Sequence, residues 1–298
     1  MRGKALVIGA SGQVGRQLLA VLGPDRSVPT SRQGNGKDWL SVDLGVLAGK
    51  PDRADELVRA HDIDTVYCVG GMTDVESCES DPEIPMRVNC WGPAALAASA
   101  AACGHRFVYF STEYVFSGHH GPYSEDAPGD PISAYGSSKW KGEMEVRKAH
   151  PDSLIVRTTV VYGPDPAGKN FLYALRHALR EGRPFRVPAD QISTPTYNYD
   201  LAQAVVALVN EGKTGVFHVC GPQRLSRQEF ATRAAIAMGL NPDYIQGVPT
   251  SELRQRAPRP LDAGLATDKL TRMRPDVRMR GVEDSVADWI SCAGEQVI

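Results

Sequence analysis

Residues 4–15 read KALVIGASGQVG, an apolar run that leads directly into three spaced glycines. Residues 4–8 have the composition of a short buried strand, and residues 16–22 have the apolar spacing of a helix. A strand, a glycine turn and a helix in this order form the fingerprint of a dinucleotide-binding unit. This stretch therefore predicts a Rossmann-like fold.

The three glycines have separate tasks in that fingerprint. Gly9 permits a tight turn, Gly12 lets the backbone approach a pyrophosphate, and Gly15 permits close packing of the helix. The helix N-terminus supplies N–H groups and a positive dipole for the phosphates. The predicted cofactor contacts of this turn are Gly9, Ser11, Gly12, Gln13 and Val14.

The second predicted strand covers residues 27–30, and the polar residues directly after it bear on the choice of cofactor. NAD-binding members of this fold carry an acid here for the ribose 2′-hydroxyl. Ser31 and Arg32 stand at that place, and a hydroxyl with a guanidinium suits a 2′-phosphate. The sequence thus favours NADP, with NAD as the alternative. Further predicted cofactor contacts follow the third and fourth strands: Asp43, a candidate for adenine, with Leu44, Val69 and Gly70.

Apolar runs typical of buried strands alternate with helical patterns along the first half of the chain. The strands are expected at 65–69, 107–110 and 154–156, and the helices at 52–60, 94–102 and 137–148. This alternation predicts an α/β fold with a doubly wound parallel sheet.

The pattern loosens after residue 163, which suggests a second, smaller part of the molecule. We expect residues 1–163, with 190–222, to form an NAD(P)-binding domain, and residues 164–189 and 223–298 to form a substrate-binding lobe. Within the second half we expect helices at 171–180, 201–209 and 226–238 and a strand at 216–219. Ser226 followed by Glu229 predicts a capping box on the last of these helices.

Composition restricts the class of protein. The chain has 298 residues, 42% of them hydrophobic and 23% charged, and a net charge of −2, so a nucleic-acid-binding surface is not expected. No run is long enough for a membrane span, and no metal site is predicted. The six cysteines lack C-x-x-C spacing, which favours a reducing compartment and a cytoplasmic location. We expect a monomer or a homodimer.

Tyr135 and Lys139 are four residues apart in a predicted helix, so phenol and ammonium share one face. A nearby ammonium favours the phenolate, and we expect the Tyr135 pKa to shift toward neutrality. Thr112 follows a buried strand, where parallel sheets present reactive groups, and is the expected third member. Together they predict carbonyl reduction or alcohol oxidation, with Tyr135 and Lys139 also contacting the cofactor.

The chain resembles an extended short-chain dehydrogenase/reductase, and specifically the dTDP-4-dehydrorhamnose reductase family. The matching stretches are residues 9–15, 111–118 (STEYVFSG), 135–139 with 142–143, 190–191 with 195–196, and 259–260. The resemblance implies Thr112, Tyr135 and Lys139 as the catalytic set and NADPH- or NADH-dependent reduction of a 4-keto-6-deoxy sugar nucleotide. It also implies substrate contacts by Thr73, Glu113, Tyr114, Val160, Asn170, Gln191 and Arg259.

Three departures from the family pattern concern the substrate. Val160 stands where the family has a tryptophan against the sugar, so a stacking face is lost. Residues 74–77 read DVES in place of DKAE, and Ser193 replaces a glycine.

Two alternatives remain open from the sequence. One is a sugar-nucleotide epimerase or dehydratase, although a dehydratase-like chain would have Thr-Asp-Glu where Tyr114 is the third residue here. The other is a non-catalytic NADP-binding subunit, since the regulatory beta subunit of methionine adenosyltransferase resembles the same family and tolerates loss of that tryptophan. A fold can retain its residues after losing its reaction.

Overall fold

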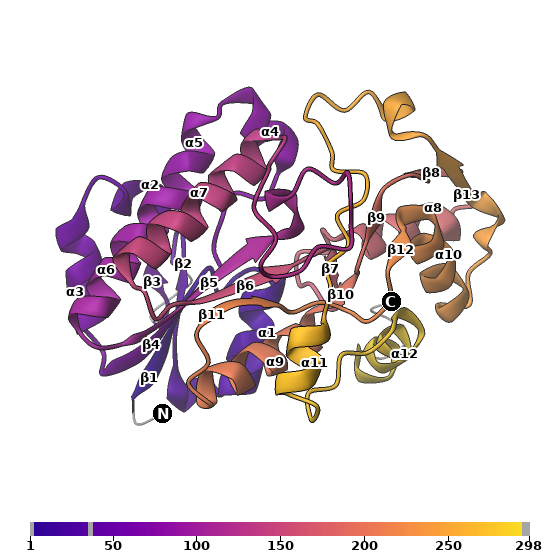
Figure 1. Ribbon diagram of the computed structural model, residues 1–298. Coiled ribbons are helices and arrows are strands. Elements are labelled where there is room, and N and C mark those ends of the chain that lie inside the picture. The colour runs from indigo at the N-terminus through magenta and orange to yellow at the C-terminus, as the bar shows by residue number, and fades with distance from the viewer. Residues whose placement is uncertain (1–2, 35–37, 294–298) are drawn as a thin grey trace.

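The computed structural model describes residues 3–34 and 38–293, and its centre is a seven-stranded sheet in which every pair of neighbours is parallel. The strand order is β11-β6-β5-β4-β1-β2-β3 (Figure 1). The chain reverses its direction of winding beside β1, which confirms the predicted doubly wound sheet. The strands are β1 (Lys4–Ile8), β2 (Ser27–Ser31), β3 (Leu40–Ser41), β4 (Ile63–Cys68), β5 (Arg106–Thr112), β6 (Leu154–Thr158) and β11 (Gly215–His218).

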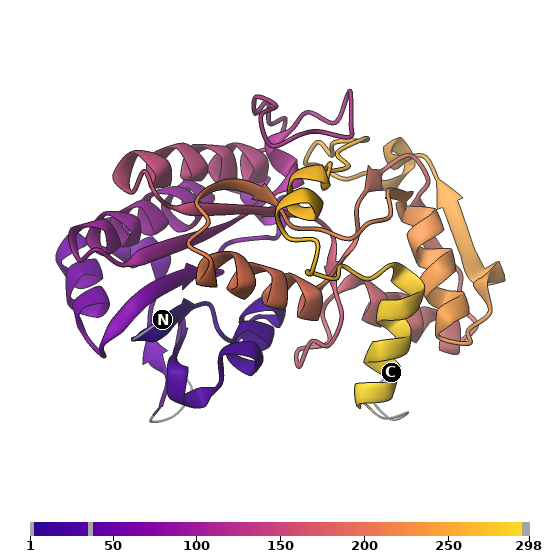
Figure 2. The same cartoon turned by 60° about the horizontal axis from the view of Figure 1, so that its bottom comes forward.

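Helices cover both faces of the sheet (Figure 2). Successive side chains of β1 point to opposite faces, so Ala5 and Val7 join one apolar cluster while Leu6 and Ile8 join the other. The first cluster is covered by α1 (Gln13–Leu22), α9 (Asn198–Asn210) and α11 (Asp268–Met273), the second by α2 (Leu44–Leu47), α3 (Pro51–Arg59), α6 (Gly92–Ala102) and α7 (Ala134–Ala149).

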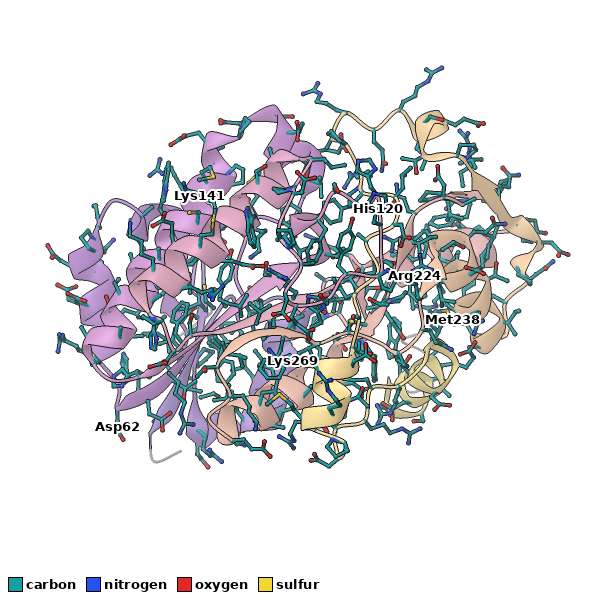
Figure 3. The ribbon with its side chains drawn as sticks, viewed as in Figure 1. Asp62, His120, Lys141, Arg224, Met238 and Lys269 are labelled. Carbon is teal, nitrogen blue, oxygen red and sulfur yellow. The ribbon has the colours of Figure 1, made fainter. Side chains whose placement is uncertain are left out.

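A third apolar cluster lies beside the sheet and holds three helices together, on the right of Figure 1. It is rich in rings, with Tyr162 and Phe171 both packed on Phe230 at centroid distances of 5.0 and 5.6 Å. Met238, directly after one of these helices, lies at one end of the molecule in Figure 3, and Asp62, directly before β4 of the sheet, lies at the other. The elements around this cluster are α8 (Phe171–Arg180), α10 (Arg227–Ala237), α12 (Val282–Ala293) and the parallel pair β8 (Phe185–Pro188) and β13 (Ile245–Val248).

Short elements connect these parts. The strand pairs are β7 (Val161–Tyr162) with β10 (Thr196–Tyr197), and β9 (Ile192–Ser193) with β12 (Leu225–Ser226). The short helices are η1 (Pro24–Arg26), α4 (Val75–Ser80), α5 (Glu83–Pro85), the π-helix η2 (Met86–Trp91), η3 (Glu113–Val115), η4 (Pro242–Tyr244) and η5 (Thr250–Leu253).

Local sequence signals located the long elements well. The helix predicted at 171–180 has those bounds, and α10 carries the predicted capping box between Ser226 and Glu229. The pairing of β8 with β13 was not predicted, because it joins segments about 60 residues apart that have no strong alternating pattern.

A buried ion pair joins α7 to the sheet. Arg157 on β6 donates to Glu143 on α7 through Nη2 at 2.7 Å and Nε at 2.9 Å, and both side chains are 2% exposed. Ser111 on β5 donates to the same carboxylate at 2.5 Å. These contacts fix α7 against β5 and β6, the three elements that carry most residues of the site described below.

Candidate active site

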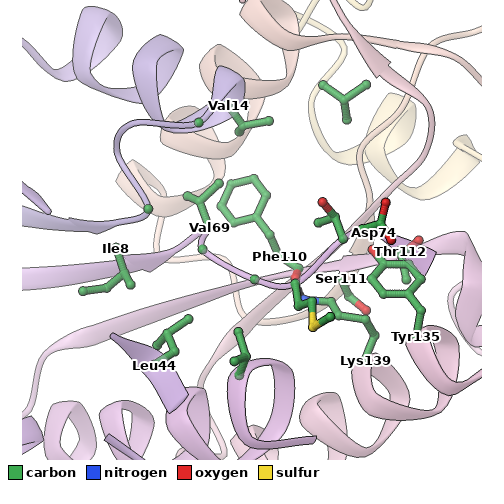
Figure 4. A pocket seen from close by; sticks show the side chains of 18 of the residues that line it. Ile8, Val14, Leu44, Val69, Asp74, Phe110, Ser111, Thr112, Tyr135 and Lys139 are labelled. Carbon is green, nitrogen blue, oxygen red and sulfur yellow. Dashed lines mark hydrogen bonds between the residues drawn. The ribbon is translucent and has the colours of Figure 1, made fainter. Parts of the chain in front are cut away.

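A cavity of about 1060 Å³ opens at the carboxyl ends of the central strands (Figure 4). Its walls come from the segments that follow β1, β4, β5 and β6, together with α7 and the start of α10. Ligands of open parallel sheets bind at this edge, where the strand order reverses. The cavity extends from the glycine turn to α7, so two different binding sites can lie within it.

The glycine turn has the shape that a dinucleotide requires. Gly9 has a φ of 83°, and a Cβ there would lie 2.6 Å from the Cα of Gly70. A Cβ on Gly15 would lie 2.4 Å from the carbonyl oxygen of Gly9. Gly12 is the N-cap of α1 and makes no side-chain cap hydrogen bond, so the first N–H groups of this helix can receive an anion.

Most of the predicted cofactor residues line this cavity. Ser31 does not, since it is a buried residue of β2, whereas the neighbouring Arg32 is exposed and lines the cavity. Asp43 also caps α2, accepting from the N–H of Gly45 at 2.8 Å. The predicted residues that line the cavity are Gly9, Ser11, Gly12, Gln13, Val14, Arg32, Asp43, Leu44, Val69, Gly70, Tyr135 and Lys139.

The three predicted catalytic residues converge at the other end of the cavity. Ser133 caps α7, accepting from Gly136 N, and Tyr135 and Lys139 both lie on the buried face of this helix. Lys139 Nζ donates to the carbonyl oxygen of Phe110 at 2.5 Å and lies 4.1 Å from the ring centroid of Tyr109. Thr112 at the end of β5 interacts with the Tyr135 phenol and lowers its pKa. Figure 4 shows Thr112, Tyr135 and Lys139 grouped at one wall.

The expected shift of the Tyr135 pKa toward neutrality is wrong for the protein without ligands. Burial raises the pKa of the phenol, the charge of Glu113 adds to the rise, and the neighbouring Thr112 hydroxyl only partly opposes it. The same burial lowers the pKa of Lys139 to about 8. Tyr135 therefore holds its proton at neutral pH, which suits a proton donor.

Four of the seven residues predicted to contact substrate line the cavity: Thr73, Glu113, Tyr114 and Val160. Glu113 is buried, and burial raises the pKa of its carboxyl. The Tyr114 ring meets the Tyr135 ring edge to face at 5.4 Å. Val160 has a φ of 42°, a left-handed conformation that is rare for a β-branched residue and is typical of functional loops.

The other three predicted substrate residues lie outside the lining, and their substrate contacts stay predictions. Asn170 caps α8 and donates to Gln13 Oε1 at 3.2 Å. Gln191 donates to Thr250 Oγ1 at 3.0 Å. Arg259 donates to the Tyr114 hydroxyl at 3.2 Å and to Glu76 at 2.7 Å. It therefore holds Tyr114, a residue of the cavity wall, without lining the cavity itself.

Sequence reasoning missed Arg227 and Thr158 as cavity residues. Arg227 is the first residue of α10 and is half-buried, with its guanidinium 5.1 Å from the Phe171 ring. The capping box predicts where this helix starts, but a local signal does not predict that the start of the helix lies across the cavity from the end of β6. Thr158 Oγ1 is buried without a hydrogen-bond partner in the part of the chain that the structure describes. Both groups are available to a ligand.

In the ranges 3–34 and 38–293, none of the helices has the length and apolar character for crossing a bilayer. Over the same ranges no cluster of three or more His, Cys, Asp or Glu side chains could hold a metal ion. All six cysteines are free thiols.

The doubly wound sheet, the glycine turn and the grouping of Thr112, Tyr135 and Lys139 define an extended short-chain dehydrogenase/reductase. The chain belongs to the RmlD substrate binding domain family, whose model matches residues 3–291.

Similar proteins support this assignment. The chain is 34% identical over 261 residues to the spore coat polysaccharide biosynthesis protein SpsK of Bacillus subtilis, covering 86% of this chain and 87% of that one. It is 34% identical over 269 residues to a dTDP-4-dehydrorhamnose reductase of Mycobacterium tuberculosis, covering 87% and 83% of the two chains. The crystal structure of dTDP-4-dehydrorhamnose reductase from Bacillus anthracis in complex with NADP superposes with a TM-score of 0.86 at 26% identity, covering 98% and 100%.

Proposed function

We propose that this chain reduces the C4 ketone of a nucleotide-linked 4-keto-6-deoxy sugar with NADPH, and with NADH as a poorer donor. The observation that carries the proposal is one cavity with a dinucleotide turn at one end and Thr112, Tyr135 and Lys139 at the other. The similarity to named dTDP-4-dehydrorhamnose reductases supports the choice of substrate.

Each residue at the α7 end has a distinct task. A bound reduced nicotinamide supplies the hydride. Tyr135, which holds its proton at neutral pH, donates that proton to the ketone oxygen. The Thr112 hydroxyl would hydrogen-bond the ketone oxygen that Tyr135 protonates, and Lys139, one helical turn further along the buried face of α7, would hold the nicotinamide ribose.

The cofactor would lie along the glycine turn. Gly9, Ser11, Gly12, Gln13 and Val14 would hold the pyrophosphate, and Asp43, Leu44, Val69 and Gly70 the adenosine and nicotinamide sides. We propose residues 1–163 with 190–222 as the cofactor domain and residues 164–189 and 223–298 as the substrate lobe. The free thiols support a cytoplasmic location, and we propose a monomer or homodimer.

The direct test is absorbance of reduced nicotinamide with NADPH or NADH and enzymatically generated dTDP-4-keto-6-deoxy-L-hexose. Consumption of NADPH that depends on this sugar supports the reductase. Tight NADPH binding without turnover, together with co-purification of a synthetase, would instead support the regulatory subunit. Oxidised NAD retained through purification would support an epimerase or dehydratase.

Arg32→Ala tests the cofactor preference. Arg32 lines the cavity beyond β2, where a 2′-phosphate would lie, and a hydrogen bond to a charged group contributes about 1.5–3 kcal/mol. We expect the Kd of NADPH, measured by fluorescence titration, to rise about 10- to 100-fold while that of NADH changes little. Arg26→Ala, an exposed arginine outside the lining, is the control. Equal weakening of both cofactors by Arg32→Ala would remove the 2′-phosphate assignment.

A further inference from the structure

Glu113 is a buried carboxyl at the reactive end of the cavity, and beyond its predicted contact with substrate it has no part in the proton transfer described above. It follows Thr112 at the carboxyl end of β5, is 6% exposed, and lines the cavity. Thr112 Oγ1 lies 2.9 Å from Glu113 Oε2, within hydrogen-bond distance. A buried carboxyl in direct contact with a reacting group is a candidate for moving a proton.

The hydrogen bonds of Thr112 give the direction of this contact. A threonine hydroxyl has one hydrogen and two acceptor positions. Tyr114 N–H donates to Oγ1 at 3.2 Å, and Thr112 Oγ1 donates to Glu113 Oε2 when that carboxyl is ionised. The Thr112 hydroxyl also lowers the pKa of the Tyr135 phenol, so it favours the phenolate and can donate to Tyr135 once that residue has lost its proton. Glu113, Thr112 and Tyr135 thus form one continuous chain.

Each turnover creates a need for such a chain. Tyr135 gives its only proton to the ketone oxygen and must regain one before the next reduction. Lys139, the other candidate donor, is buried and holds one of its protons on the Phe110 carbonyl. Both side chains line the cavity, but Glu113 differs from Lys139 because it reaches Thr112 Oγ1 at 2.9 Å, whereas the hydrogen bond of Lys139 Nζ goes to the Phe110 carbonyl.

We propose that Glu113 returns a proton to Tyr135 through the hydroxyl of Thr112 after each reduction, an inference that rests on the proposed function. The O–H bond of the Glu113 carboxyl breaks as Thr112 Oγ1 accepts its proton. The original O–H bond of Thr112 breaks as that proton joins the Tyr135 phenolate. Nothing is oxidised or reduced in the relay, and Glu113 takes up one proton from the solvent, conducted by water that enters the emptied cavity.

The surroundings of Glu113 favour its protonated form. Burial raises the pKa of the carboxyl and is the largest influence on it. The charged or titratable groups that face it are Tyr114 beside it in the chain, Tyr135 on α7, Cys220 after β11 and Arg227 on α10. The Thr159 and Thr112 hydroxyls oppose this rise in the pKa, as does Arg227, the one cation among these groups, but they do not cancel it.

Glu113→Gln separates the relay from a structural role. Glutamine retains the size and the hydrogen bond to Thr112 but cannot release a proton. In a stopped-flow experiment with NADPH-loaded protein and the keto sugar, we expect one equivalent of NADPH to be oxidised at the wild-type rate. The steady-state rate should then be about 100-fold below wild type, the lower range of acid–base contributions.

Two results of this experiment would overturn the relay. One is a first turnover slowed as much as the steady state, which places Glu113 in binding or folding. The other is an unchanged steady state. Glu79→Gln is the matched control, because its carboxylate accepts from Ala134 N outside the cavity lining, and it should show no burst. If wild-type protein oxidises no NADPH with the keto sugar, the proposed function itself fails.

A second readout requires no turnover. Difference infrared spectra of cofactor-free wild type and Glu113→Gln should contain the C=O band of a protonated carboxyl that belongs to Glu113. We expect this band to titrate above the ordinary glutamate pKa of about 4.3. If Glu113 is instead fully ionised at a pH just above about 4.3, the relay is contradicted even when the protein is an active reductase.

Discussion

Tyr135→Phe is expected to lower kcat by about 100- to 10,000-fold, the usual contribution of a positioned general acid. The substitution removes only the phenolic oxygen and leaves the ring between α7 and Tyr114. NADPH affinity should stay within about twofold, because a removed transition-state contact lowers kcat without weakening ground-state binding. The measurement is the initial rate of NADPH oxidation together with a fluorescence titration of NADPH.

The matched control is Tyr173→Phe. Its hydroxyl accepts from Asp165 N at 3.2 Å and lies outside the cavity lining, so loss of this hydroxyl should leave kcat unchanged. Undiminished turnover in Tyr135→Phe would remove this residue from proton transfer and would also remove the end point of the relay from Glu113.

Glu143→Gln is expected to cost about 3–5 kcal/mol of unfolding free energy, because it leaves the Arg157 guanidinium buried without its counter-charge. The carboxylate accepts from Arg157 and Ser111, and water cannot replace these contacts at 2% exposure. Native stability is only about 5–15 kcal/mol in total, so this single change consumes a large share of it. Chemical denaturation at neutral pH measures the loss.

An exposed pair provides the comparison. Arg278 and Asp284 are 2.8 Å apart with side chains 72% and 61% exposed, and Asp284→Asn should cost less than about 1 kcal/mol. Equal losses in Glu143→Gln and Asp284→Asn would mean that the buried pair contributes no more than a solvated one. Lower activity in the refolded Glu143→Gln protein is also expected, since the pair fixes α7 against β5 and β6.

The sequence by itself determined the features that depend on neighbours within a few residues. The glycine turn was recognisable because its φ and close contacts exclude side chains, as Gly9 and Gly15 show. Tyr135 and Lys139 share a face because a helix brings residues four apart together. The capping box of α10 is equally local, since Ser226 and Glu229 satisfy each other's backbone N–H groups.

Only the tertiary structure decided the features that depend on distant segments. Arg227 reaches the cavity because α10 begins opposite β6, about 70 residues earlier in the chain. The rise in the Tyr135 pKa, opposite to the expected shift, comes from burial and from the charge of Glu113. Burial and charge depend on which segments pack together, and the spacing of residues along one helix cannot report them.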